Sequence, residues 1–342
     1  MNDLKRLVRS NIWDLIPYSS AREEYNGSGD VFLDANENPF GTLNRYPDPV
    51  QKELKQQLAS RKNVNVNQIF IGNGSDEIID LVFRIFCNPG SDKALTFSPT
   101  YGMYNVSATM NDVELMEVPL TENFQIDSNN LSFFEDPKLK LVFICSPNNP
   151  TGNLINPDEI SLILNKFNGI VVLDEAYIDF SNSESWSQQL NRFPNLIVLQ
   201  TFSKAHGLAS ARVGVAYADI ELIALLNKVK PPYNVSALNQ QAALQSLNRR
   251  NEYETNIELI LNQRNILSIE LEKLNCVKRV YPSDANFLLV EFVDSKEVYE
   301  QLLASKIVVR NRDMVVSGCL RITVGTVDEN KQLLKVLTNW KN

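Results

Sequence analysis

The sequence predicts an α/β protein with a mostly parallel sheet sandwiched by helices, followed by a smaller α+β domain at the C-terminal end. Two observations support this. Short, continuously apolar segments alternate with helix-length segments between residues 68 and 219, which is typical of parallel strands buried on both faces. After the break PPYNVS at 231–236, long helical patterns accompany a few strand-like segments. The 342 residues suffice for two such domains.

The beginning of the chain carries weaker signals than the rest. A short amphipathic helix is predicted from Leu4, a short strand at 31–33, and a helix at 49–60 with Pro49 in its first turn. We therefore expect three parts: an N-terminal arm that packs on the small domain at 1–35, a large domain at 36–235 and a small C-terminal domain at 236–342.

The predicted large domain repeats one pattern, in which an apolar strand is followed by a polar or glycine-rich turn and then by a helix. Six segments show this pattern, or at least its strand and turn: 68–86, 94–104, 141–152, 169–180, 196–204 and 212–219. Beyond them, helices are predicted at 218–230, 237–249, 251–274, 295–304 and 328–340, and strands at 286–292, 306–310 and 319–324.

Composition excludes several classes of function. The net charge of −8 argues against nucleic acid as a partner, because nucleic-acid binders usually present a basic face. No apolar run approaches the ~20 residues of a membrane span, and the charged N-terminus does not resemble a signal peptide. Four widely spaced cysteines are typical of reduced thiols in a cytoplasmic protein. A single histidine, His206, excludes a multi-histidine metal site, and we expect His206 to be a loop residue rather than a catalyst.

Two ionisable residues stand at the ends of predicted apolar strands. Lys204 follows the strand at 196–199, and partial desolvation there would lower its pKa enough to supply a nucleophilic amine. A solvated loop lysine is the alternative. Asp174 ends the strand in VVLDEAY, where an acid is costly unless it meets a cation. A role in capping the next turn is its alternative.

Further polar groups gather at the same predicted edge, where open parallel sheets bind ligands. GNGSDE at 72–77 begins a helix near Ser75 and would form an anion site, although it lacks the lysine of a P-loop. SPNNPTG at 146–152 holds Asn149 in a rigid turn, with a purely structural turn as the alternative. Tyr101 follows another strand and could stack on a ligand ring or belong to the core.

One ligand would use all of these groups together. Pyridoxal phosphate needs a lysine, a carboxylate for its ring nitrogen, donors to its phenolate oxygen and an anion cradle for its phosphate. Lys204 and Asp174 would supply the first two, and Asn149 with Tyr177 the third. The cradle would be formed by the backbone at 74–76 together with Ser203 and Arg212.

These motifs resemble those of the fold-type I pyridoxal-phosphate aminotransferases, class II, and in particular the histidinol-phosphate group. The similarity extends over nearly the whole chain in the family's order. The matching stretches are LDANENPFG (33–41), RYPDP (45–49), GNGSDE (72–77), SPTYGMY (98–104), SPNNPTG (146–152), VVLDEAY (171–177), TFSKAHGLASARVG (201–214) and CLRITVGT (319–326).

The resemblance implies a role for each residue at the cofactor. Lys204 would form the Schiff base and move the proton, and Asp174 would keep the ring nitrogen protonated. Asn149 and Tyr177 would bond the phenolate oxygen. The residues implied to hold the phosphate are Ser75, Asp76 (through backbone groups), Ser203 and Arg212, with Tyr46 reaching the cofactor of a partner subunit in a homodimer.

The resemblance also implies where substrates bind. Arg310 and Arg321 would bind substrate anions, and Tyr18 and Asn36 would line the substrate pocket. Because Arg312 lies close to Arg310, the arginine that takes the substrate phosphate is left open between these two.

The implied reaction is transamination between L-histidinol phosphate and 2-oxoglutarate, which yields imidazole-acetol phosphate and glutamate in histidine biosynthesis. A threonine-phosphate decarboxylase and a broad aromatic or aspartate-type aminotransferase are the alternatives within the fold. A non-catalytic regulatory protein on this fold is disfavoured, because such proteins carry a DNA-binding domain for which this chain has no spare length.

Overall fold

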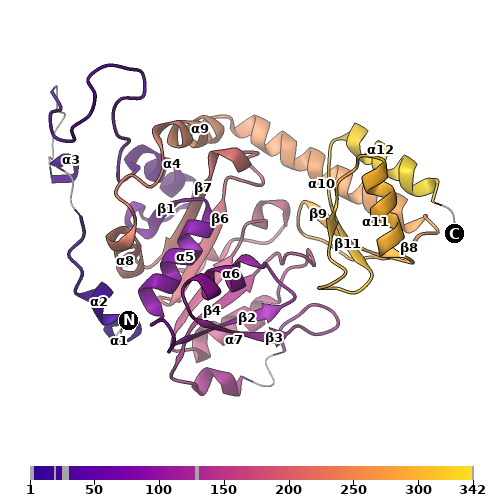
Figure 1. Cartoon of the computed structure of the whole chain (residues 1–342), viewed down its shortest axis with the longest axis horizontal. Coiled ribbons are helices and arrows are strands. Elements are labelled where there is room, and N and C mark those ends of the chain that lie inside the picture. The colour runs from indigo at the N-terminus through magenta and orange to yellow at the C-terminus, as the bar shows by residue number, and fades with distance from the viewer. Residues whose placement is uncertain (1–3, 19–20, 25–30, 128–130, 341–342) are drawn as a thin grey trace.

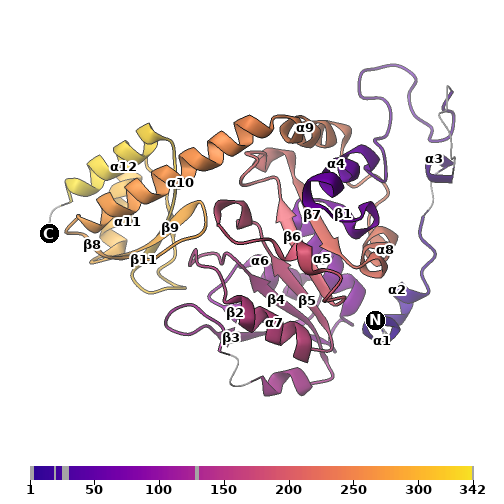
Figure 2. The ribbon, with the colours of Figure 1, turned by 180° about the vertical axis from the view of Figure 1, so that it is seen from behind.

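The computed structural model describes residues 4–18, 21–24, 31–127 and 131–340. A large α/β domain occupies one side of the molecule, and a smaller domain built from the C-terminal part of the chain lies beside it (Figure 1). The long helix α10 (Arg250–Glu272) runs from the first domain into the second, as Figure 2 shows from behind. The predicted two-domain α/β architecture is therefore observed.

The large domain is built on a sheet whose strands, within the described residues, follow the order β1-β7-β6-β5-β4-β2-β3. All run in one direction except β7, which is antiparallel to both of its neighbours. Most strand carboxyl ends consequently meet at one edge of the sheet. The strands are β1 (Ile69–Asn73), β2 (Lys93–Ser98), β3 (Glu114–Pro119), β4 (Leu139–Cys145), β5 (Ile170–Asp174), β6 (Leu196–Thr201) and β7 (Val213–Ala218).

Both faces of this sheet are buried, because successive side chains of its apolar strands point to opposite sides. In β5, for example, Val171 and Leu173 join one hydrophobic core while Ile170 and Val172 join the other. The helices that cover the first face are α4 (Lys52–Lys62), α7 (Pro157–Lys166) and α9 (Ala237–Asn248), and those on the second face are α5 (Ser75–Phe86), α6 (Met103–Met110) and α8 (Ile220–Val229).

The small domain has an antiparallel sheet with the strand order β10-β11-β9-β8. A capping box between Thr326 and Glu329 starts its last helix. Its strands are β8 (Val277–Val280), β9 (Phe287–Phe292), β10 (Arg310–Asn311) and β11 (Cys319–Thr323), covered by α10, α11 (Ser295–Ala304) and α12 (Val327–Thr338).

Short 3-10 turns connect several of these elements: η1 (Val66–Gln68), η2 (Ser132–Glu135), η3 (Ile178–Phe180), η4 (Trp186–Gln189) and η5 (Ala209–Ala211). In the described part of the chain, no helix combines the length and the apolar character that crossing a membrane requires.

The N-terminal arm differs from the prediction that residues 1–35 pack on the small domain. Its helices α1 (Leu4–Leu7), α2 (Ser10–Trp13) and α3 (Ala21–Glu24) lie on the opposite side of the large domain from the small one (Figure 1). Leu4 and Val8 are buried in the core formed by α5 and α8. The apolar side chains of α1 and α2 thus pack against the large domain. Residues 31–33, predicted as a strand, form none.

The boundary between the domains also differs from the prediction. The predicted boundary places helix α9 in the small domain. Its residues Ala243 and Leu247 are instead buried in the core of the large domain. The core of the small domain begins only at Leu267, in the second half of α10. The turn at 231–236 therefore separates two helices of the large domain, and α10 itself joins the domains.

Candidate active site

A pocket of about 130 Å³ lies where the carboxyl ends of the parallel strands meet. Sequence motifs far apart in the chain converge here, because each follows a strand of the same sheet or borders one. All nine residues predicted to contact the cofactor within one chain line it: Ser75, Asp76, Tyr101, Asn149, Asp174, Tyr177, Ser203, Lys204 and Arg212.

Lys204 stands just past the end of β6, in the loop that leads to η5. Its Nζ lies 5.5 Å from the centroid of the Tyr177 ring, and the described residues offer it no hydrogen bond or ion pair. Burial, assisted by the positive charge of Arg321, lowers the pKa of the Lys204 amine. The amine is thus partly desolvated, in contrast to a solvated loop lysine, and is suited to act as a nucleophile.

Asp174 is the last residue of β5 and is only 3% exposed. Its Oδ1 accepts the Ala176 N–H at 3.0 Å, and its Oδ2 accepts the Tyr104 hydroxyl at 2.8 Å. Burial raises the pKa of Asp174 to about 6, although both hydrogen bonds oppose this rise. A buried carboxylate beside a pocket fits a ligand that brings a cationic N–H group, such as a protonated pyridine ring.

Tyr104 is a residue of this site that the sequence did not single out. It lies in α6, is fully buried, and stacks on Phe143 of β4 with the ring centroids 4.9 Å apart. The Tyr101 ring meets it edge to face at 5.6 Å. The only sequence signal for Tyr104 is its position three residues after Tyr101. A buried aromatic residue in a helix usually indicates nothing more than core packing.

The predicted anion cradle forms at the start of α5. Gly74 is the N-cap, with φ of 78°, and no side chain caps the helix. A Cβ atom at Gly74 would lie 2.6 Å from Arg212 Nη2, so the guanidinium packs directly on this glycine. Arg212 also pairs with Asp76 at 3.3 Å. Uncapped backbone N–H groups beside a guanidinium and the Ser203 hydroxyl are the donors that a phosphate needs.

The small domain contributes Arg321 of β11 to the pocket region. Its Nη1 donates to Oδ1 of Asn149, and Nδ2 of Asn149 lies 3.5 Å from the Tyr177 hydroxyl. The Nε atom of Arg321 is buried and has no hydrogen-bond partner in the described residues. A buried guanidinium with an unused donor at this position fits an anionic group of a substrate.

Arg310 and Arg312, between which the sequence left a choice, differ in their surroundings. Arg310 of β10 pairs in register with Arg321 but is exposed. Arg312 is half-buried, and its Nε is buried without a hydrogen-bond partner among the described residues. Burial, and next the charge of Arg321, lower the pKa of Arg312, which also interacts electrostatically with Tyr177. Arg312 is therefore the more buried of the two arginines, and it is close enough to Arg321 and Tyr177 to interact with them electrostatically.

Three predicted residues do not reach the pocket of their own chain. Asn36 and Tyr46 line a separate hollow, and the Tyr46 ring stacks on Tyr233 with the centroids 4.4 Å apart. Tyr18 is largely exposed and does not line the pocket around Lys204. The expectation that Tyr18 and Asn36 line the substrate pocket is thus not met within one chain, because the segment that carries them extends away from the sheet edge (Figure 1).

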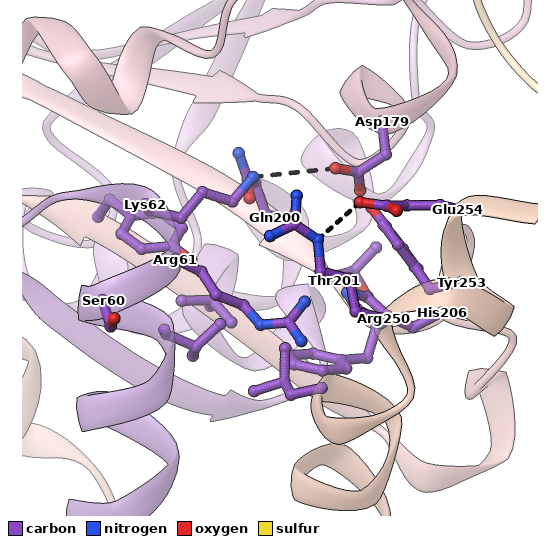
Figure 3. Close-up of a pocket in the computed structure, with 15 residues that line it drawn as sticks. Ser60, Arg61, Lys62, Asp179, Gln200, Thr201, His206, Arg250, Tyr253 and Glu254 are labelled. Carbon is purple, nitrogen blue, oxygen red and sulfur yellow. Dashed lines mark hydrogen bonds and ion pairs between the residues drawn. The ribbon is translucent and has the colours of Figure 1, made fainter.

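A second pocket, of about 380 Å³, adjoins the lysine loop and shares Thr201 with the first (Figure 3). Its facing charges pair with one another, as Lys62 does with Asp179 and as Arg250 does with Glu254. It contains neither a nucleophilic lysine nor a buried carboxylate of the kind found at Asp174. We therefore assign the chemistry to the smaller pocket.

His206 lines this second pocket rather than the first. Its ring is stacked between Phe202 and Tyr253, with the centroids 4.4 Å apart on each side, and its Nδ1 lies 2.9 Å from the Ser246 hydroxyl. Burial lowers the pKa of His206 to about 4, so the ring is neutral at physiological pH. These contacts are those of a packed loop residue.

Comparison with known proteins agrees with this geometry. The family model described as aminotransferase class I and II matches residues 24–337. The fold is that of fold-type I pyridoxal-phosphate-dependent transferases. A histidinol-phosphate aminotransferase from Parabacteroides distasonis is 52% identical over 100% of both chains, and one from Cytophaga hutchinsonii is 49% identical over 98% of this chain and 99% of the relative.

Among solved structures, the histidinol-phosphate aminotransferase from Clostridium acetobutylicum superposes with a TM-score of 0.77. It is 26% identical and covers 86% of this chain and 90% of its own. The chain therefore belongs to the class I and II aminotransferase family and, within it, to the group of histidinol-phosphate aminotransferases.

The buried charge of Asp174 leads to a prediction about the cofactor-free protein. Because the pKa in the folded state is about 6 and the ordinary value is 3.8, ionisation of Asp174 costs folding stability as the pH rises from about 4 to about 6. We expect Asp174→Asn to raise the free energy of unfolding at pH 8 by up to about 3 kcal/mol and to change it little at pH 4. Denaturant titration at both pH values measures this difference.

The exposed Asp328 provides the control, because Asp328→Asn removes a charge that is already hydrated. Equal stability of Asp174→Asn and the unmodified protein at pH 8 would show that the Asp174 carboxylate is not destabilising.

Proposed function

We propose that the chain transfers the amino group between L-histidinol phosphate and 2-oxoglutarate, with pyridoxal 5'-phosphate as cofactor, in histidine biosynthesis. The observation that carries this proposal is the convergence of Lys204, Asp174 and the anion cradle of α5 in one pocket, with Arg321 of the small domain beside it. The near-50% identity to histidinol-phosphate aminotransferases over the whole chain supports the choice of substrate.

The pocket residues fit this cofactor group by group. When bound, pyridoxal phosphate supplies a carbonyl that condenses with amines and a ring that delocalises negative charge from the substrate Cα. The start of α5, Arg212 and Ser203 would bind its phosphate. Asn149 and Tyr177 would bond the phenolate oxygen, and Tyr101 would flank the ring.

Two ionisable groups would carry the proton chemistry. Lys204 Nζ would take the proton from the substrate Cα, and its lowered pKa suits a general base. Asp174 would keep the ring nitrogen of the cofactor protonated, so that the ring could accept electron density. Tyr104 is a positioning residue, because its hydroxyl bonds the Asp174 carboxylate and favours the ionised form.

Arginines near the small-domain side of the pocket would recognise both substrates. L-histidinol phosphate carries a phosphate and no carboxylate, whereas glutamate carries two carboxylates. A guanidinium binds either group through paired N–H donors. We propose Arg321 and Arg312 for this role, since each has a buried Nε without a partner in the described residues, and we regard the exposed Arg310 as the weaker candidate.

We further propose that the active protein is a homodimer with shared sites, in which Tyr46 reaches the cofactor phosphate of the partner. Support comes from the segment that carries Tyr46, where Leu33 and Phe40 are 92% and 82% exposed. Such apolar exposure on an extended segment is typical of a surface covered by another chain. The free, buried cysteines agree with a cytoplasmic location.

Each half-reaction of the proposed transamination can be tested separately. We expect L-histidinol phosphate, added to the holoenzyme without any oxo acid, to convert the bound cofactor into its amine form, and 2-oxoglutarate to restore the original absorbance. Lys204→Ala should lower turnover at least about a thousandfold, while the exposed Lys166→Ala should not change it. A response to threonine phosphate or to aromatic amino acids, but not to L-histidinol phosphate, would contradict the proposed substrate.

The choice between the two arginines has its own test. Arg312→Gln should raise the KM for L-histidinol phosphate between about tenfold and a hundredfold, because a hydrogen-bonded charge on the substrate phosphate is lost. Arg310→Gln, which alters an exposed side chain, should raise it less than about threefold. The opposite order of the two KM values would assign the phosphate to Arg310.

Shared sites predict recovery of activity in hybrid dimers. Homodimers of Lys204→Ala and homodimers of Tyr46→Ala should each have impaired activity. In a mixed dimer of the two variants, one of the two active sites would keep both residues intact. Co-refolding equal amounts should therefore restore about a quarter of the unmodified activity. No recovery in hybrids that are verified by mass would mean that Tyr46 does not act across the interface.

A further inference from the structure

A pocket of about 390 Å³ lies between the start of α4, the start of β1 and helix α8. It shares no residue with the pocket around Lys204. Among the described residues that line it, three lysines and two asparagines supply the polar groups, isoleucine, valine and alanine side chains supply the rest, and none is acidic. The lining residues are Val50, Lys52, Lys55, Val66, Asn67, Ile69, Ile220, Ile223, Ala224, Asn227 and Lys230.

Lys55 is the unusual member of this set. It lies on the buried side of α4 and is only 7% exposed, although lysine is almost never buried without a partner. The described residues give its ammonium group no hydrogen bond and no ion pair. Burial, and next the charge of Lys230, lower the pKa of Lys55 to about 8, and the attraction of Asp48 opposes this only in part.

The groups nearest to Lys55 do not neutralise it. The Asp48 carboxylate is occupied by the start of α4, where its oxygens accept the N–H groups of Val50 at 2.9 Å and Lys52 at 2.7 Å. Lys230 Nζ donates to the Pro232 carbonyl at 2.9 Å, and its positive charge repels that of Lys55. Three lysines therefore line one pocket, and the described residues that line it include no acid.

We propose that this pocket binds a small anion that carries a phosphate group, either inorganic phosphate or a phosphate monoester, between Lys52, Lys55 and Lys230. A phosphate dianion offers several strong acceptor oxygens and two negative charges to this group of lysines, whereas a carboxylate offers only one negative charge. The apolar side chains of Ile69, Ile220 and Ile223 reduce solvent screening and strengthen the attraction. This site is independent of the transamination proposed above.

The test uses the cofactor-loaded protein, so that the phosphate cradle of α5 is already filled. We expect calorimetric titration with inorganic phosphate to show saturable binding that Lys55→Met weakens at least about tenfold. Lys62→Met, on the same helix but in the other pocket, is the matched control and should bind phosphate normally. Arg312→Gln should also bind it normally, which separates this site from the proposed substrate site.

A second readout locates the anion at Lys55 itself. Phosphate should slow acylation of the Lys55 amine several-fold, measured by peptide mass spectrometry, and leave Lys62 in the same sample unchanged. Repeating both measurements with glycerol phosphate distinguishes a site for free phosphate from one that accepts a monoester.

Three results would overturn the proposal: no saturable binding below about 10 mM phosphate, unchanged binding in Lys55→Met, or loss of binding in Arg312→Gln alone. Because methionine fills the space of the buried lysine stem without its charge, Lys55→Met should keep the unmodified turnover, which confirms that the variant is folded.

Discussion

The rest of the site is arranged around one buried charge, the carboxylate of Asp174. It stands at the end of a central strand, where it is 3% exposed, and the hydrogen bonds that it accepts from the described residues come from the Ala176 N–H and the Tyr104 hydroxyl. Tyr104 is itself fixed by stacking on Phe143 in the next strand. The sheet thus holds an acid in a costly place and in a single orientation. In the proposed holoenzyme, a cationic ring nitrogen beside Asp174 would offset this cost.

The second constraint is the contact between the two domains beside this charge. The Asp284 N–H donates to the Gly152 carbonyl at 2.7 Å, and its carboxylate accepts the Leu154 N–H at 3.2 Å. Gly152 has φ of 86°, and a Cβ there would lie 2.5 Å from the Ser283 hydroxyl, so this junction requires glycine. The same junction brings Arg321 to Asn149. In the proposed reaction, the large domain would supply the reacting groups and Arg321 of the small domain would recognise the charge of the substrate.

Two lysines illustrate how the neighbouring groups determine which chemical role a buried lysine can have. Burial lowers the pKa of both Lys204 and Lys55. Lys204 faces a carboxylate, an aromatic ring and an anion cradle, and this combination supports covalent chemistry. Lys55 faces two other lysines and apolar walls, which support only the binding of an anion. Desolvation by itself is therefore a poor guide to function, and the neighbouring charges must be counted.

The sequence by itself determined the sheet and most of the cofactor pocket. Asp174, Asn149 and Lys204 each follow an apolar strand, and parallel strands must end at one edge, so local pattern was enough to bring them together. Tertiary structure alone decided the partner of Asp174, the greater burial of Arg312 than of Arg310, and the packing of the N-terminal arm on the large domain. These outcomes depend on which surfaces meet across long stretches of chain, and periodicity and spacing carry no information about such contacts.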